Sequence, residues 1–265
     1  MAFRLRSYGQ QGAVRVLCAL NIAASLLIWI SMLMGYLTGT SGRWWEILFG
    51  LPGDFRLFLH RPWTLCTYMI AQVSPLQLLF NMLWLVWFGR ILADRGGDRL
   101  IYTLYIGGGL AGGLAYLAAA AAMPGAGSFL IGSSAATLSV MIYATMANPG
   151  LHVPLLLIGE VRLKWIAVFT VILTLLGATG IAAHCAHLAG ITFPFAYRAW
   201  LRVRTRPRQP RRRVPAAMSQ GNVDPEELLD ALLDKIRVSG FESLSLNEKK
   251  RLDQLSQTIK NEPKV

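Results

Sequence analysis

Long apolar runs separated by short charged or glycine-rich stretches constrain the fold of this chain more than any other feature. A helix that crosses the hydrocarbon core of a bilayer, about 30 Å thick, needs roughly 20 apolar residues at about 1.5 Å per residue. Of the 265 residues, 54% are hydrophobic and 15% are charged, and several runs reach or approach this length. Because such a composition is too apolar for an ordinary water-soluble domain, we predict an all-α, polytopic membrane protein.

Six apolar runs are the predicted membrane spans. They cover residues 16–37, 75–89, 100–122, 132–147, 165–176 and 181–200. The first run resembles a signal peptide in its basic and apolar parts, but it is too long for one and has no small-x-small cleavage site. The third run contains five glycines, and such small residues let neighbouring helices approach closely in lipid. The sequence therefore predicts a bundle of six transmembrane helices.

Basic residues alternate from one connection to the next. They lie before the first span and after the second, fourth and sixth, whereas the connections after the third and fifth spans carry no charge. Since Lys and Arg concentrate in cytoplasmic loops, we expect both termini in the cytoplasm. The connection at residues 38–74 then lies outside, where its many Trp and Phe side chains suit the headgroup level of the membrane.

The net charge of +12 comes partly from an arginine cluster directly after the last span. A basic cluster at this place is typical of contact with anionic cytoplasmic lipid, which we favour over nucleic acid as the partner. The cluster comprises Arg198, Arg202, Arg204, Arg206, Arg208, Arg211, Arg212 and Arg213.

The three cysteines are scattered along the chain, with neither disulfide nor zinc spacing.

Composition divides the chain into a membrane domain at residues 1–200, a basic linker rich in Pro and Arg at 201–223, and a cytoplasmic helical hairpin at 224–265. In the hairpin, Asp224 is a good N-cap, and Ser245 with Glu248 forms a capping box. About forty residues bury too little surface to be stable alone, so we expect the hairpin to dock on a partner or to self-associate. The alternative is a flexible amphipathic tail, and the sequence identifies no partner for it.

The sixth run contains two histidines, His184 and His187, within the segment A-H-C-A-H-L-A-G. An ionisable residue inside a span is costly and indicates function. Three residues apart, the two side chains lie near one face of a helix, where they could also bind a metal. Because no Asp, Glu or third His stands at membrane depth in the sequence, we predict no metal and no cofactor. For His184 a packing role is a fair alternative.

Ser134 begins the fourth span, within the small-residue turn I-G-S-S-A-A-T at residues 131–137. The fourth and sixth spans both begin outside, so Ser134 and His187 are expected in the outer half of the bilayer as a nucleophile and its base. The N-terminus of the fourth span offers unpaired N–H groups, and Asn81 and Gln77 on the second span offer amide donors for an oxyanion. The alternative is that the small residues serve only helix packing.

The order of these features resembles the rhomboid family of intramembrane serine proteases, over about residues 17–200. Residues 61–70, R-P-W-T-L-C-T-Y-M-I, and 78–89, L-L-F-N-M-L-W-L-V-W-F-G, are similar to the family's first loop and second helix. I-G-S-S-A at 131–135 is similar to its nucleophile motif, and A-H-L-A-G at 186–190 to its histidine motif. The tail pattern at 232–245 also resembles the short extension of some bacterial rhomboids.

The resemblance implies Ser134 as nucleophile, His187 as general base, and an oxyanion hole formed by the Ser134 N–H and the Asn81 amide. The family usually has histidines four and nine residues before this asparagine, where the chain has Gln77 and Gln72. Gln77 can still donate a hydrogen bond to the oxyanion. The chain also differs from the family pattern at Ala135, Leu138 and Pro194.

The resemblance further implies an activity and a location. We expect an intramembrane serine protease of a bacterial inner membrane that cleaves the transmembrane helices of other proteins near the outer face, using a Ser134–His187 dyad. The runner-up is a catalytically inactive rhomboid-like protein that binds membrane helices. A transporter with a His184–His187 proton relay is a third hypothesis, but the sequence has neither inverted repeats nor an acidic partner for the relay.

Overall fold

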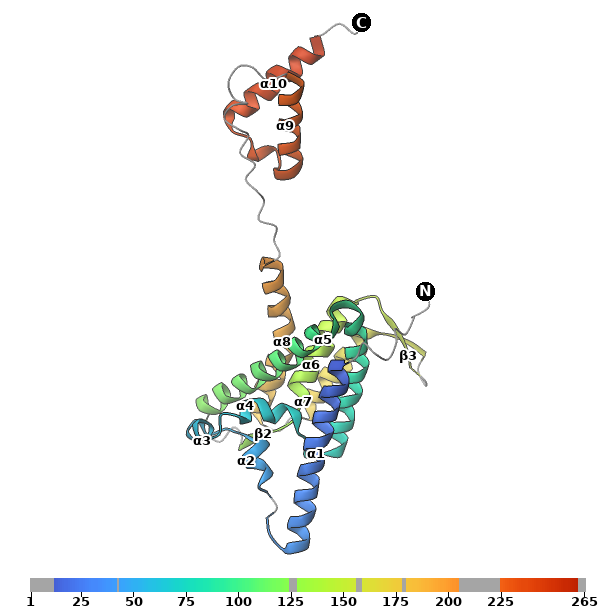
Figure 1. Cartoon of the computed structure of the whole chain (residues 1–265), viewed down its shortest axis with the longest axis vertical. Coiled ribbons are helices and arrows are strands. Elements are labelled where there is room, and N and C mark those ends of the chain that lie inside the picture. Colours follow the sequence, from blue (N-terminus) through green and yellow to red (C-terminus); the bar gives the residue numbers. More distant parts are fainter. Residues whose placement is uncertain are drawn as a thin grey trace. The chain divides into compact units, whose positions relative to one another are not determined.

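The structure is a computed structural model that describes residues 12–41, 43–123, 128–155, 159–177, 180–204 and 225–261. It divides into two compact units, Met1–Thr205 and Arg206–Val265 (Figure 1). Helices dominate both units, and the described strands form two small two-stranded sheets in the first unit. The prediction of an all-α helical bundle is confirmed.

Among the described residues of the first unit, two helices are long and apolar enough to cross a membrane: α1 (Gly12–Thr38) and α5 (Pro75–Ala122). The 48 residues of α5 are two helices joined at Gly97, where φ is 63° and ψ is −169°. A positive φ of this kind favours glycine, and the chain reverses its direction there (Figure 1). The second and third predicted spans thus lie in the two halves of α5. A turn was expected over the charged residues 90–99. The structure instead has helix on both sides of Gly97.

Three further helices complete the bundle: α6 (Ser134–Ala147), α7 (Leu163–Leu176) and α8 (Ile181–Arg204). They correspond to the fourth, fifth and sixth predicted spans. With 14 residues each, α6 and α7 are shorter than the roughly 20 residues of a straight span. Whether all six segments cross the membrane therefore stays a prediction.

The aromatic-rich connection between α1 and α5 contains short elements rather than one extended loop. These are α2 (Trp45–Phe49), β1 (Leu51–Pro52), α3 (Phe55–His60), α4 (Thr64–Thr67) and the 3-10 helix η2 (Tyr68–Ile70). Strand β1 pairs antiparallel with β2 (Phe129–Leu130), which leads into α6. Trp45 and Phe49 are buried, whereas Trp44, Phe55 and Trp63 are exposed. The connection is thus anchored to the bundle by part of its aromatics and presents the others outward.

The connection between α6 and α7 contains a β-hairpin that the sequence analysis did not predict. Its strands, β3 (His152–Leu155) and β4 (Gly159–Arg162), pair antiparallel. Strand β3 and the bend between the two halves of α5 lie at the same end of the bundle, whereas α2 and β2 lie toward the other end (Figure 1). This arrangement places the basic connections together at one end.

Small residues bring the second half of α5 against α6. A Cβ atom at Gly108 would overlap Ser139, and one at Gly112 would lie 2.7 Å from the Ala135 Cβ. Neighbouring glycines on α5 leave room in the same way for Met69 and Tyr68. The close helix approach that the glycines of the third span predict is therefore present.

The second unit consists of α9 (Pro225–Ser239), the 3-10 helix η4 (Phe241–Ser243) and α10 (Leu246–Asn261). Leu232 and Leu244 are its buried apolar residues among those described. The predicted capping box is present, because the Glu248 N–H donates to Ser245 Oγ at 3.3 Å and the Ser245 N–H donates to Glu248 Oε2 at 2.7 Å. The Lys235 ammonium also binds Glu248, with Nζ 2.6 Å from Oε1.

Parts of the linker and tail predictions fall outside the described residues. The N-cap residue Asp224 is among them, as is most of the linker. Of the arginine cluster, Arg198, Arg202 and Arg204 are described and form the end of α8. Binding of anionic lipid by this cluster stays a prediction, as does docking of the tail. Outside the described part lie Arg206, Arg208, Arg211, Arg212 and Arg213.

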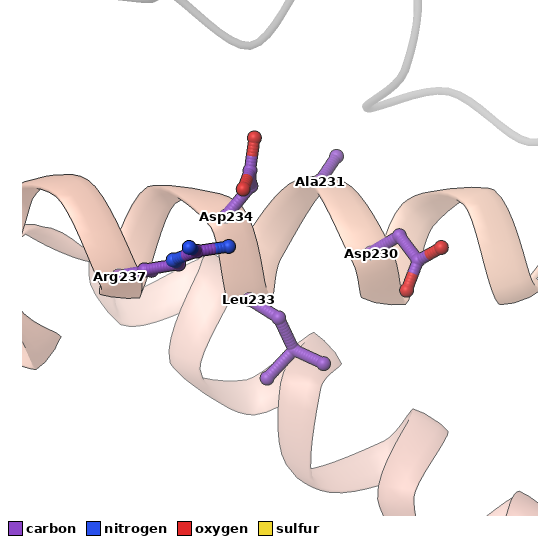
Figure 2. A pocket seen from close by; sticks show the side chains of 5 residues that line it. All are labelled: Asp230, Ala231, Leu233, Asp234 and Arg237. Carbon is purple, nitrogen blue, oxygen red and sulfur yellow. The ribbon is translucent and has the colours of Figure 1, made fainter.

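A pocket of about 470 Å³ lies against α9 in the second unit. Figure 2 shows the side chains that line it: Asp230, Ala231, Leu233, Asp234 and Arg237. The lining contains two carboxylates and a guanidinium but no Ser, Cys or His that could act as a nucleophile or base. The candidate nucleophile Ser134 and base His187 both lie in the first unit.

Candidate active site

The site begins at the turn that leads into α6. Ser134 is the first residue of the helix and Ser133 is its N-cap. Gly132 has a φ of 135°, and its N–H donates to the Tyr68 carbonyl at 2.9 Å. A side chain at this position would be strained by the backbone and would also overlap the Gln77 amide. Glycine therefore lets Gln77 lie against the backbone two residues before Ser134.

Helix α8 packs against α6 at the same level. A Cβ atom at Gly190 would overlap the backbone of Ala135, the residue after Ser134. Gly112 of α5 also approaches Ala135 there, and a Cβ at this glycine would lie 3.1 Å from the Ala186 carbonyl oxygen. Three helices thus meet almost backbone to backbone, and this contact sets the distance between the start of α6 and the histidine segment of α8.

The contact brings Ser134 and His187 together. Ser134 Oγ lies 2.7 Å from His187 Nε2, which is hydrogen-bonding distance for a hydroxyl and an imidazole. The His187 side chain is buried, with 8% of the residue exposed, and Ser134 is half-buried. The buried Nδ1 atom of His187 has no hydrogen-bond partner among the described residues. The geometry therefore offers a serine with a neighbouring base, but no carboxylate oriented on that base.

His184 lies one turn before His187 on α8 and is half-buried. Its Nδ1 atom is 2.8 Å from the carbonyl oxygen of Gly180, so its polar contact is local to the start of the helix. Within the part of the chain that the structure describes, no three His, Cys, Asp or Glu side chains come together as metal ligands. The structure does not bring His184 into the Ser134–His187 contact.

Both candidate oxyanion donors lie near Ser134. Asn81 is buried, with 7% exposed, and its Oδ1 accepts a hydrogen bond from Thr137 Oγ1 at 3.2 Å. Thr137 lies one turn after Ser134 on α6, and its hydroxyl also contacts the Ser134 carbonyl oxygen at 3.0 Å. Gln77 is half-buried and approaches Gly132 with its Nε2. Two side-chain amides, one turn apart on α5, therefore lie beside the N-terminus of α6.

Sequence reasoning missed the side chains behind Asn81. Its Nδ2 donates to Gln72 Oε1 at 3.0 Å, and Gln72 Nε2 donates to Asn21 Oδ1 at 2.8 Å. Asn21, on α1, is completely buried. A signal was present, because a polar amide within a long apolar run is costly in lipid and indicates a role.

A cleft of about 1520 Å³ opens onto the serine and histidine. Ser134, His187, Asn81 and Gln77 all line it. Its lining includes apolar side chains of α5 (Leu76, Phe80 and Trp84) and of α7 (Phe169 and Leu173), together with the charged residues Arg43 and Glu46. An elongated apolar ligand could therefore lie between these helices with its polar groups directed at the serine.

Comparison with known protein families gives two matches within the chain. Residues 59–204 match the model of the Rhomboid domain, and residues 223–258 match a family of unknown function (DUF6576). A search of curated proteins finds no match to the chain. The Rhomboid match begins in the aromatic-rich connection and ends with α8, and it includes Ser134, His187 and both candidate oxyanion amides. Since it covers more than half of the 265 residues, the chain belongs to the rhomboid family.

Proposed function

We propose that the protein is an intramembrane serine protease that cleaves transmembrane helices of other membrane proteins. Members of the rhomboid family are generally serine proteases that act within the membrane. The observation that carries the proposal for this chain is the 2.7 Å distance between Ser134 Oγ and His187 Nε2. A hydroxyl at this distance from an imidazole can lose its proton as it attacks a carbonyl carbon.

In the first half of the reaction, His187 Nε2 accepts the Ser134 proton while Ser134 Oγ bonds to the carbonyl carbon of the substrate peptide. The negative charge that develops on the carbonyl oxygen is stabilised by hydrogen-bond donors at the start of α6. The donors are the Ser134 N–H, which belongs to the unpaired N-terminal turn of a helix, and the side-chain amides of Asn81 and Gln77. His187 then gives the proton to the departing amide nitrogen, and the carbon–nitrogen bond breaks.

The second half of the reaction releases the acyl group from Ser134. A water molecule gives a proton to His187 Nε2 and attacks the ester carbon, through the same oxyanion contacts. His187 returns the proton to Ser134 Oγ as the ester bond breaks, so the enzyme is restored. Because His187 Nδ1 has no carboxylate partner among the described residues, the orientation of the ring depends on its packing in α8.

The apolar walls of the cleft favour a substrate that arrives from the membrane. A peptide bond can reach Ser134 only if the substrate backbone is not fully hydrogen-bonded as a helix, since helical carbonyls are engaged with N–H groups four residues later. Small or helix-breaking residues near the cleaved bond satisfy this requirement. The proposed substrate is therefore a transmembrane helix that unwinds readily near the outer membrane face.

The proposal is tested by labelling the detergent-purified protein with a fluorophosphonate probe, which reacts with activated serines. The wild type is expected to be labelled, whereas Ser134→Ala and His187→Ala are expected to lose labelling and cleavage of a model substrate helix. Ser133→Ala, a change at the neighbouring serine, is the matched control and is expected to keep labelling. Equal labelling of wild type and Ser134→Ala, or labelling of neither, would contradict the dyad and favour an inactive rhomboid-like protein that binds helices.

A further inference from the structure

Four buried polar side chains form a continuous chain of hydrogen bonds through the bundle. They are Asn21 of α1, Gln72 before α5, Asn81 of α5 and Thr137 of α6, and their exposed fractions are 0%, 0%, 7% and 3%. The three connecting distances are 2.8, 3.0 and 3.2 Å. An unpaired polar group in such a place costs free energy, so each member depends on its neighbours.

The direction of the chain is set at the end that lies farthest from Ser134. Tyr105 Oη donates to the Met69 carbonyl at 2.7 Å, so its oxygen is left as an acceptor. Asn21 Nδ2 lies 2.8 Å from this oxygen and 2.8 Å from the Leu17 carbonyl. Both acceptors require the nitrogen of the Asn21 amide on this side, which turns its Oδ1 toward Gln72.

That orientation passes to the next two amides. Because Asn21 Oδ1 can only accept, the atom of Gln72 that faces it must be the donor Nε2, and Gln72 Oε1 then faces Asn81. Asn81 must in turn present Nδ2 to Gln72 and Oδ1 to the Thr137 hydroxyl. Reversing any one amide would place two donors or two acceptors face to face. The orientation of Asn81 is thus determined through Gln72.

We propose that Gln72 is a positioning residue that orients the Asn81 amide for the oxyanion hole. The amide nitrogen of Asn81 carries two hydrogens, and the bond to Gln72 uses one of them. The other serves the oxyanion in the cleft that Asn81 lines beside Ser134. The inference rests on the proposed protease function and extends it to a residue behind the reacting groups.

Glutamine suits this position because its side chain ends in both a donor and an acceptor. A methionine has nearly the same length but makes neither hydrogen bond, and it leaves Asn81 free to turn. The position of the glutamine itself is secured separately, since the Gln72 N–H donates to Ser25 Oγ at 3.0 Å. The Gln72→Met substitution therefore removes the orienting contacts and keeps the backbone contact.

The test is a double-mutant cycle on the full-length protein, with kcat and KM measured on a model substrate helix. Gln72→Met is expected to lower kcat about tenfold, as loss of a buried hydrogen bond predicts, and to leave KM within about a factor of two. In an Asn81→Ala background the same substitution is expected to lower kcat by less than about twofold. A purely structural role would lower kcat by the same factor in both backgrounds, and that result would overturn the inference.

Asn148→Ala is the matched control, because it also removes a hydrogen bond of a partly buried side-chain amide. Asn148 Nδ2 donates to the Ala144 carbonyl at the opposite end of α6, 3.0 Å away. We expect this change to leave kcat the same and to lower only the thermal midpoint, whereas a kcat loss equal to that of Gln72→Met would show a general effect of destabilisation.

A second variant covers failure of Gln72→Met to fold. Asn21 is hydrogen-bonded to Gln72, which in turn is hydrogen-bonded to Asn81. The kcat loss caused by Asn21→Leu must therefore also vanish in the Asn81→Ala background, and a persistent loss would overturn the inference. Fluorophosphonate labelling separates this outcome from failure of the proposed function. If labelling of the wild type does not depend on Ser134, both proposals fail, whereas labelled wild type with additive kcat losses removes only the role of Gln72.

Discussion

Helices α6 and α7 are both apolar and both have 14 residues, but the rest of the protein holds them differently. Eight residues of α6 are buried, most of them small, whereas four residues of α7 are buried. The four of α7 form one stripe at positions 163, 166, 167 and 170, and large side chains such as Phe169 and Leu173 are exposed. The comparison teaches that the helix carrying the candidate nucleophile is enclosed, while the helix lining the cleft contacts the bundle along one stripe and leaves its large side chains exposed.

The largest expected effect comes from adding bulk where α6 meets α8. Gly190→Leu forces a side chain into the Ala135 backbone. Because backbone atoms cannot move aside as a flexible side chain does, we expect loss of the folded state, a larger effect than the about 1–3 kcal/mol of ordinary core overpacking. Val168→Leu, which enlarges an exposed side chain of α7 by a single methylene, is expected to change the free energy of unfolding by less than about 0.5 kcal/mol. Thermal unfolding in detergent measures both variants. Similar midpoints for the two would remove the distinction between the helices.

Removing side chains tests the same comparison with a smaller effect. Met141 of α6 is 1% exposed and Phe169 of α7 is 60% exposed. Met141→Ala is expected to cost about 2–5 kcal/mol through the cavity it leaves, whereas Phe169→Ala is expected to cost less than about 0.5 kcal/mol. Unfolding midpoints at matched detergent concentration decide between these values, and a large loss for Phe169→Ala would mean that α7 is as tightly held as α6.

The smallest effect is expected in the second unit, where a charge contact replaces close apolar packing. Burial acts to raise the pKa of Glu248, but hydrogen bonds from Lys235 and Ser245 outweigh it and lower this pKa from 4.5. The contact therefore stabilises α9–α10 fully above that ordinary value, and the stabilisation is lost as pH falls through the lowered pKa.

Hydrogen exchange of α9 and α10 in the full-length protein measures this pH dependence. Relative to the intrinsic amide rate at each pH, exchange is expected to accelerate on acidification below about pH 4.5, and Glu248→Gln is expected to remove that acceleration. The exchange of α6 provides an internal reference, because α6 itself contains no Asp or Glu. Parallel acceleration in α6 would point to a global change rather than to Glu248.

Much of the fold could be predicted because membrane helices follow from apolar length alone. The run at 181–200 predicted α8, which ends at Arg204. The turn expected at residues 90–99 was wrong in extent, since charge marks where a chain leaves the membrane but does not end the helical hydrogen bonds before Gly97. The β3–β4 hairpin was missed because strands of four residues carry too short a pattern to be distinguished from a loop.

By itself, the sequence determined the order of the helices, the small residues at their contacts, and the identity of Ser134 and His187 as the candidate pair. Only the tertiary structure decided that their reacting atoms lie 2.7 Å apart and that Asn21 and Gln72, which are 51 residues apart in the chain, stand behind Asn81. The physical reason is that hydropathy acts through local composition, whereas a hydrogen bond depends on the separation and direction of two atoms. That geometry arises when helices α1, α5, α6 and α8 pack, and no single segment contains it.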